Sequence, residues 1–271
     1  MLMCRRTLLF LFCLFLYSFE TFARTVVISD IDDTLKQANS VGTAPEQIYH
    51  FLKKVPYLDM RNLFNEIKNN EKKNLGTIRF FYVSAAKDFT FNADKWIQKN
   101  QFPIGRSTLK TLNEKRSTYD FKHAVIKDII EAEKKTLNVE ENESLHILMF
   151  GDNAQADAMV YSDLTHEMHL DSAIFIRDVR AEATFFNSTL PIKKIIGVNY
   201  FFSEVELLAF PEFHLINPDL KLKTYDNYKR RALIPQYTLK TLSRRLESLY
   251  GDKSRAASDA LNFWNDYYSR F

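Results

Sequence analysis

Short apolar runs alternate with longer amphipathic stretches over the first two thirds of the chain. Four runs have the length and composition of buried strands, and they cover residues 26–28, 78–83, 146–150 and 173–176. The stretches between them are long enough for crossover helices, which is typical of a parallel sheet. The pattern therefore predicts an α/β fold of the Rossmann-like kind, with a parallel sheet flanked by helices.

Each of the four runs ends in polar residues. The first ends at residues 29–34 (SDIDDT), the second at Ser84, the third at residues 151–152 and the fourth at residues 177–178. Ligands of open α/β sheets bind outside the carboxyl ends of the strands, where loops rest on a rigid support. We therefore expect a functional site at that edge.

Two segments depart from the simple alternation. Residues 35–76 are longer than an ordinary connection and contain a predicted helix at 59–72, so we expect a small cap insertion there. After residue 200 the pattern becomes helical. The chain thus divides into a Rossmann-like domain over residues 24–200, which includes the cap, and a helical C-terminal appendage over residues 201–271.

The amino terminus has the pattern of a secretory signal peptide. Arg5 and Arg6 precede an apolar run over residues 8–19, and small residues allow cleavage after Ala23. The run is about a dozen residues long, short of the roughly 20 that a spanning helix needs, so a retained anchor is the weaker interpretation. We expect residues 1–23 to be removed and the protein to be periplasmic or secreted.

Cysteine usage and charge narrow the possible chemistry. Cys4 and Cys13 both lie in the predicted signal peptide, so the mature chain would have no disulfide, thiol nucleophile or cysteine-ligated metal. The formal net charge is +3, which does not by itself indicate nucleic-acid binding. Cations of the C-terminal region would suit peripheral contact with an anionic membrane surface, although a solvated helix face is the more ordinary explanation.

Acidic residues gather in two of the strand-end turns. Asp30, Asp32 and Asp33 follow the first strand, and Asp152 and Asp157 follow the third. Such crowding is unfavourable without a cation or proton, and Mg²⁺ prefers oxygen ligands and also bridges phosphate. Near a strand end, Asp30 and Asp32 can flank one phosphoryl group, so that one attacks while the other protonates the leaving oxygen. A lone Asp-x-Asp is more often a solvated turn, but the second acidic turn favours phosphoryl chemistry.

The motifs resemble those of the haloacid dehalogenase superfamily, in the right order. Residues 30–34 (DIDDT) look like its first motif, Ser84 like its second, Lys122 like its third, and residues 151–152 with Asp157 like its fourth. The resemblance implies the haloacid dehalogenase version of the Rossmann-like fold.

A narrower resemblance, to the phosphatidate phosphatase catalytic domain family known from a yeast actin-patch protein, covers about residues 25–180. It is carried by residues 29–36 (SDIDDTLK), 81–85 (FYVSA), 102–105 (FPIG), 150–157 (FGDNAQAD) with Tyr161, and 176–179 (IRDV). At residues 86–88 and 153–154 the sequence differs from the pattern usual in the family. Neither difference replaces a residue that would take part in the reaction.

The resemblance implies three catalytic residues. Asp30 would be the nucleophile and a Mg²⁺ ligand, and Asp32 the general acid/base, which also offers its backbone carbonyl to the metal. Lys122 would neutralise the charge of the nucleophile and the phosphate. We prefer Lys122 to nearby cations because Thr118 would cap a helix whose first turn carries Lys122 to the rim of the site.

The resemblance also implies the remaining ligands. Thr34 would orient the first turn, and Thr34, Ser84 and Lys122 would bind the phosphoryl oxygens. Asp152 and Asp157 would complete the metal shell.

The function implied is that of a Mg²⁺-dependent phosphomonoester hydrolase that acts through an aspartyl-phosphate, with phosphatidate as substrate and diacylglycerol and phosphate as products. Two alternatives remain open at this point. One is a broad-specificity exported acid phosphatase or nucleotidase, and the other is a non-catalytic interaction scaffold with the same fold. The expected partner is a phospholipid or a small phosphomonoester, and no nucleic acid.

Overall fold

Six strands of the described chain form one parallel sheet, in the spatial order β3-β2-β1-β4-β5-β6. Their bounds are β1 Ala23–Ser29, β2 Thr77–Lys87, β3 Arg106–Lys110, β4 Ser144–Asp152, β5 Asp171–Arg177 and β6 Val198–Phe201. The structure is a computed structural model that describes residues 23–38, 52, 54–73, 77–137, 143–179, 195–201, 204–207 and 210–213.

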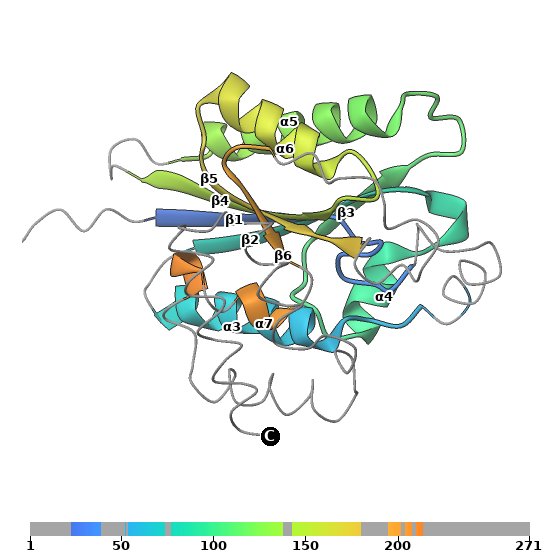
Figure 1. Cartoon of the computed structure of the whole chain (residues 1–271), viewed down its shortest axis with the longest axis horizontal. Coiled ribbons are helices and arrows are strands. Elements are labelled where there is room, and N and C mark those ends of the chain that lie inside the picture. The colour runs from blue at the N-terminus through green and yellow to red at the C-terminus, as the bar shows by residue number, and fades with distance from the viewer. Residues whose placement is uncertain are drawn as a thin grey trace, which may run out of the picture.

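Helices cover both faces of the sheet (Figure 1). α5 (Thr118–Lys135) and α6 (Asp157–Met168) lie on one face. α3 (Leu58–Lys73), α4 (Ala93–Lys99) and the short α7 (Glu204–Leu207) lie on the other. Two single-turn 3₁₀ helices, η1 (Asp88–Thr90) and η3 (Pro211–Phe213), complete the described elements. Among the described residues, no helix combines the length and apolar character needed to cross a membrane.

The central strands are buried on both faces, which is why the sequence shows them as nearly unbroken apolar runs. In β1, Val26 and Ile28 pack in the apolar cluster that contains α5 and α6. Val27, between them, packs in the cluster that contains α3 and α4. β4 and β5 alternate in the same way, so two cores form, one on each side of the sheet.

The α/β class and the parallel sheet are confirmed, and all four predicted strands are present. The pattern did not predict β3 and β6, which are the two outer strands of the sheet. β3 (RSTLK) is mostly polar, and β6 (VNYF) has only four residues. An edge strand is shorter and less completely buried than a central one, so it leaves a weaker apolar signal.

The predicted cap insertion, residues 35–76, belongs in part to the core of the fold. Its helix, expected at residues 59–72, is α3, and α3 buries Met60 and Phe64 under the sheet. The ring of Phe64 lies 4.9 Å from that of Phe150 in β4. Most of the rest of the insertion lies outside the described residues, and the cap itself stays a prediction.

The chain continues to build the fold past the predicted boundary at residue 200. β6 ends at Phe201, and Leu207, Phe210 and Phe213 join the same buried cluster as α3. From residue 214 on, the predicted appendage lies outside the described residues. So does the predicted signal peptide, apart from Ala23, which is the first residue of β1. Both stay predictions.

The connection from α4 to β3 passes very close to the backbone of β2. The hydroxyl of Tyr82 donates to the carbonyl of Pro103 at 2.6 Å in the buried core. A Cβ on Gly105 would lie 2.2 Å from the carbonyl oxygen of Phe80, closer than any side-chain carbon can approach. Residue 105 must therefore be glycine for the connection to pack against β2.

We expect Gly105→Ala to lower the free energy of unfolding by about 2–3 kcal/mol, because the added methyl group forces two packed backbones apart. Urea denaturation followed by circular dichroism measures this change. Ile104→Ala is the matched control, because Ile104 is 77% exposed and should change stability by less than about 0.5 kcal/mol. Equal stability of the two variants would contradict the close contact.

Candidate active site

The strand order reverses between β1 and β4, which lie side by side at the centre of the sheet. In open α/β sheets such a switch point leaves a crevice at the carboxyl ends of the strands. The two acidic turns of the sequence follow β1 and β4. The structure therefore places both turns at this switch point.

Backbone hydrogen bonds hold the turn after β1 in place. The amide of Asp30 donates to the carbonyl of Phe150 in β4 at 2.9 Å, and the amide of Lys36 donates to the carbonyl of Ile31 at 2.8 Å. Asp33 has φ 56°, in the left-handed region that aspartate tolerates better than most residues. The carboxylates of this turn are thus mounted on a fixed loop.

The turn after β4 is shaped by a glycine. A Cβ on Gly151 would lie 2.5 Å from the Cβ of Asp157. Without one, Oδ2 of Asp157 accepts from the amide of Asp152 at 3.2 Å, and Oδ1 of Asp152 accepts from the amide of Ala154 at 2.7 Å. Gly151 therefore lets Asp157, at the start of α6, reach back to the end of β4.

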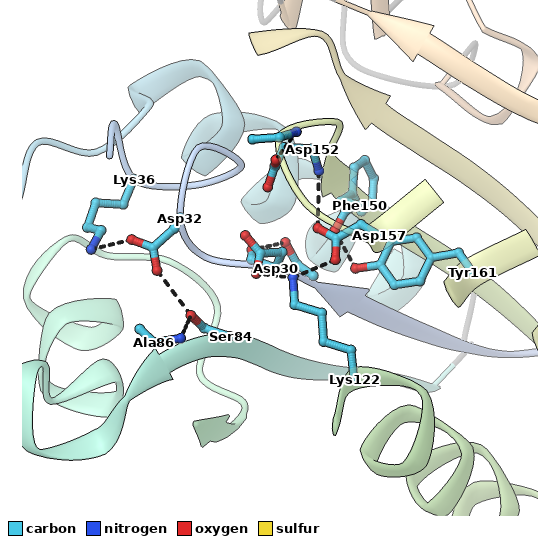
Figure 2. A network of polar contacts seen from close by, with 12 residues as sticks. Asp30, Asp32, Lys36, Ser84, Ala86, Lys122, Phe150, Asp152, Asp157 and Tyr161 are labelled. Atoms are coloured by element: carbon cyan, nitrogen blue, oxygen red, sulfur yellow. Dashed lines mark hydrogen bonds and ion pairs between the residues drawn. The ribbon is translucent and has the colours of Figure 1, made fainter. Parts of the chain in front are cut away.

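Lys122 joins the two acidic turns. Its Nζ lies 2.7 Å from Oδ1 of Asp30 and 2.5 Å from Oδ1 of Asp157, and all three side chains are buried (Figure 2). The side chain of Ser117 accepts from the amide of Asp120 and so caps α5, one residue before the expected cap at Thr118. The structure thus brings Lys122 of α5 next to Asp30 and Asp157, whereas its predicted role toward the phosphate stays a prediction.

Burial and mutual repulsion change the protonation of this group. Loss of solvent, together with repulsion by Asp157 and Asp32, raises the pKa of Asp30 to about 8 against the opposing effect of Lys122. Burial, then Asp157 and Asp30, also raise the pKa of Asp152 well above its usual range. Burial would lower the pKa of Lys122, but the surrounding carboxylates outweigh it and the pKa is raised. The buried group of Asp30, Asp152, Asp157 and Lys122 therefore contains more carboxylates than cations.

The buried carboxylates fit a divalent cation. Asp30, Asp152 and Asp157 each offer an oxygen, and these oxygens all lie within 4.8 Å of one another. Oδ2 of Asp30 and Oδ2 of Asp152 are buried and accept no hydrogen bond from the described chain. Buried polar atoms seldom stay unsatisfied, and hard cations take carboxylate oxygens. The three residues could therefore hold a metal ion.

Asp32 belongs to a separate network on the other side of the turn, as Figure 2 shows. One carboxylate oxygen lies 2.5 Å from Nζ of Lys36, and the other accepts from the hydroxyl of Ser84 at 3.0 Å. The side chain of Asp32 is thus outside the carboxylate group of Asp30. Coordination of a metal ion by the backbone carbonyl of Asp32 stays a prediction. The contact of Ser84 with phosphate also stays a prediction.

Thr34 is fully buried, and its hydroxyl finds no partner within the described chain. Its carbonyl lies 3.4 Å from Nη2 of Arg177, at the end of β5. That guanidinium is buried between an ion pair with Glu204 at 2.7 Å and the ring of Tyr57 at 3.9 Å. Residues that flank the site thus hold the turn of Thr34 in place, whereas its predicted role toward phosphate stays a prediction.

Two residues contribute to the site although the sequence analysis assigned them no role. Lys36 forms an ion pair with Asp32, four residues earlier. A lysine at this spacing from an aspartate of the acidic turn was the signal in the sequence that could have predicted the pair. The hydroxyl of Tyr161 donates at 3.0 Å to the carbonyl of Phe150, which also accepts from Asp30. Tyr161 therefore braces the junction of β1 and β4 from α6.

Comparison with known proteins gives one match that spans the site. The family model described as phosphatidate phosphatase APP1, catalytic domain, matches residues 25–178. No curated protein matches the chain. The crystal structure of a UGT transferase from Siraitia grosvenorii in complex with UDP is similar over 57% of this chain and 28% of its own length. The two chains are 9% identical over this region and the TM-score is 0.28, so the similarity indicates neither a shared fold nor a shared function.

The family match covers more than half of the chain and contains both acidic turns, Ser84 and Lys122. The site geometry and the match therefore agree, and the chain belongs to the family of the phosphatidate phosphatase APP1 catalytic domain.

Proposed function

We propose that the protein is a Mg²⁺-dependent phosphatidate phosphatase with Asp30 as its nucleophile. The observation that carries this proposal is the position of Asp30. One of its carboxylate oxygens is held by Lys122, while the other is buried beside Asp152 and Asp157 and accepts no hydrogen bond from the residues that the structure describes. The family to which the chain belongs is a phosphatase family, which supports the reaction class.

In the first step, Oδ2 of Asp30 attacks the phosphorus of phosphatidate and forms an aspartyl-phosphate. The bond from phosphorus to the glycerol oxygen breaks, and that oxygen takes a proton from the carboxyl group of Asp32, so diacylglycerol leaves. An aspartate nucleophile divides a difficult hydrolysis into two easier reactions. Lys122 holds the attacking carboxylate in place, and its charge offsets that of the incoming phosphate.

In the second step, water attacks the phosphorus of the aspartyl-phosphate. Asp32, now ionised, takes a proton from that water, the bond from phosphorus to Oδ2 of Asp30 breaks, and inorganic phosphate leaves. Both enzyme groups return to their starting state. Lys36 and Ser84, which contact the two oxygens of Asp32, position this acid/base.

Asp30, Asp152 and Asp157 would hold the Mg²⁺ ion, whose bound form supplies positive charge to the phosphoryl oxygens in the transition state. The charges support this assignment. Three carboxylates face the single ammonium of Lys122, which leaves an excess of two negative charges when all are ionised. A divalent cation balances that excess.

We expect wild-type protein with Mg²⁺ to release phosphate from phosphatidate, and Asp30→Asn to reduce the rate on the order of 10³-fold or more, because an amide cannot form the phosphoenzyme. Phosphate release from mixed micelles measures this. Asp171→Asn is the matched control, because Asp171 is exposed at the opposite end of β5 and should keep the wild-type rate.

The same assay with nucleotides and sugar phosphates separates the alternatives. A clear preference for soluble phosphomonoesters would replace phosphatidate as the substrate and leave the chemistry intact. If wild-type protein releases no phosphate from any of these compounds, the catalytic proposal fails and the interaction scaffold takes its place.

We expect Mg²⁺ at about 100 times its Kd to stabilise the protein by about 2.7 kcal/mol, which would raise the Tm by roughly 5–10 °C. Asp152→Asn should remove most of this rise, because an amide oxygen is a weaker ligand than the buried carboxylate oxygen it replaces. Differential scanning calorimetry with and without chelator measures the shift. An undiminished rise in this variant would place the ion elsewhere, and Asp171→Asn again serves as control.

A further inference from the structure

Two apolar side chains project from the edge of the sheet that carries the active site. Phe89 lies in η1 directly after β2, and Leu112 lies directly after β3, and they are 68% and 65% exposed. β2 and β3 are neighbours, with Lys87 in register with Lys110 at their ends. The segments that carry Phe89 and Leu112 therefore leave the sheet side by side, on the same edge as Ser84.

These two segments, residues 87–90 and 110–116, are held together by lysine contacts. Nζ of Lys87 lies 3.0 Å from the carbonyl oxygen of Thr111 and 2.8 Å from that of Glu114. Nζ of Lys110 donates to the carbonyl of Arg116 at 2.9 Å. These hydrogen bonds fix the backbone that carries Phe89 and Leu112. Little conformational entropy is therefore lost when the two side chains are buried against another surface.

The same two segments carry an excess of positive charge. They contain four cations and two carboxylates, namely Lys87, Lys110, Lys115 and Arg116 against Asp88 and Glu114. Burial, and then repulsion by Lys87, lower the pKa of Lys110, and Arg116 and Lys122 add to this effect. The rim therefore attracts anions close to the active site.

Exposed apolar residues are ordinary when they stand alone. Ile104 and Ile196 are exposed too, but each precedes an outer strand, β3 or β6, and so lies at the opposite edge of the sheet. Phe89 and Leu112 differ in that they share one rim with several cations and with the catalytic turns. Apolar tips surrounded by Lys and Arg are the chemistry of peripheral proteins that bind anionic lipid.

We propose that residues 87–90 and 110–116 dock the catalytic edge of the sheet on an anionic bilayer. Phe89 and Leu112 enter the boundary between headgroups and acyl chains. Lys115 contacts lipid phosphates, whereas the guanidinium of Arg116 is paired with Glu114. The inference rests on the proposed function, since phosphatidate carries its phosphate in the headgroup layer. Docking at this rim brings the Asp30 turn to that layer while the acyl chains stay in the bilayer.

Local insertion is measured with Phe89→Trp in the full chain, mixed with vesicles of phosphatidylcholine and phosphatidylglycerol that carry brominated acyl chains. The expected result is quenching of the introduced indole, above the signal of the wild-type tryptophans, that weakens as salt is raised. Ile104→Trp is the matched control and should show no added quenching. Quenching that is absent for Phe89→Trp, or equal in the two variants, would overturn the proposal.

The second measurement compares two substrates. Phe89→Ser combined with Leu112→Ser should lower hydrolysis of phosphatidate in these vesicles about tenfold and keep hydrolysis of a soluble phosphomonoester within about twofold, since neither residue contacts the reacting groups. Equal losses on both substrates would contradict docking. Absence of hydrolysis by wild-type protein would instead refute the proposed function, and the quenching experiment, which contains no phosphatidate, would still decide the docking surface.

Discussion

The burial of Lys122 between Asp30 and Asp157 is the interaction on which the site depends. An ammonium group without solvent is costly unless carboxylates compensate it, and three buried carboxylates surround this one. The reverse also holds, because Asp30, Asp152 and Asp157 could not share one buried crevice without that cation. Each group therefore makes the burial of the others possible. When all three carboxylates are ionised, an excess of negative charge remains, which is why the group could hold a metal ion.

The sheet provides this arrangement through its topology. Asp30 and Asp152 follow the two adjacent strands at which the order reverses, and Lys122 and Asp157 come from the starts of the two helices on one face. Asp30, Asp152 and Asp157 lie at the ends of regular elements and Lys122 lies inside α5, so the side chains are placed by rigid supports. Small residues adjust the final fit, as Gly151 shows, since any side chain there would displace Asp157 from the end of β4.

The fold extends beyond the segment that defines the family. The family match ends at residue 178, yet β6 and α7 follow it and bury Phe201 and Leu207 in the main core. Glu204 of α7 pairs with Arg177, which contacts the carbonyl of Thr34 in the turn after β1. A segment outside the family domain is thereby linked to the loop that carries Asp30.

The fold class, the four central strands and the two acidic turns could all be predicted from the amino-acid sequence, because doubly buried strands are continuous apolar runs and the turns that follow them carry local, ordered motifs. The sequence also indicated Lys122, although through resemblance. The position of Lys122 between Asp30 and Asp157, which are 92 and 35 residues away, became visible in the folded structure alone. The folded structure likewise separated Asp32, with Lys36 and Ser84, from the carboxylate group, and placed the polar edge strands β3 and β6. These features depend on contacts between distant residues, and a local pattern of apolar and polar positions does not encode such contacts.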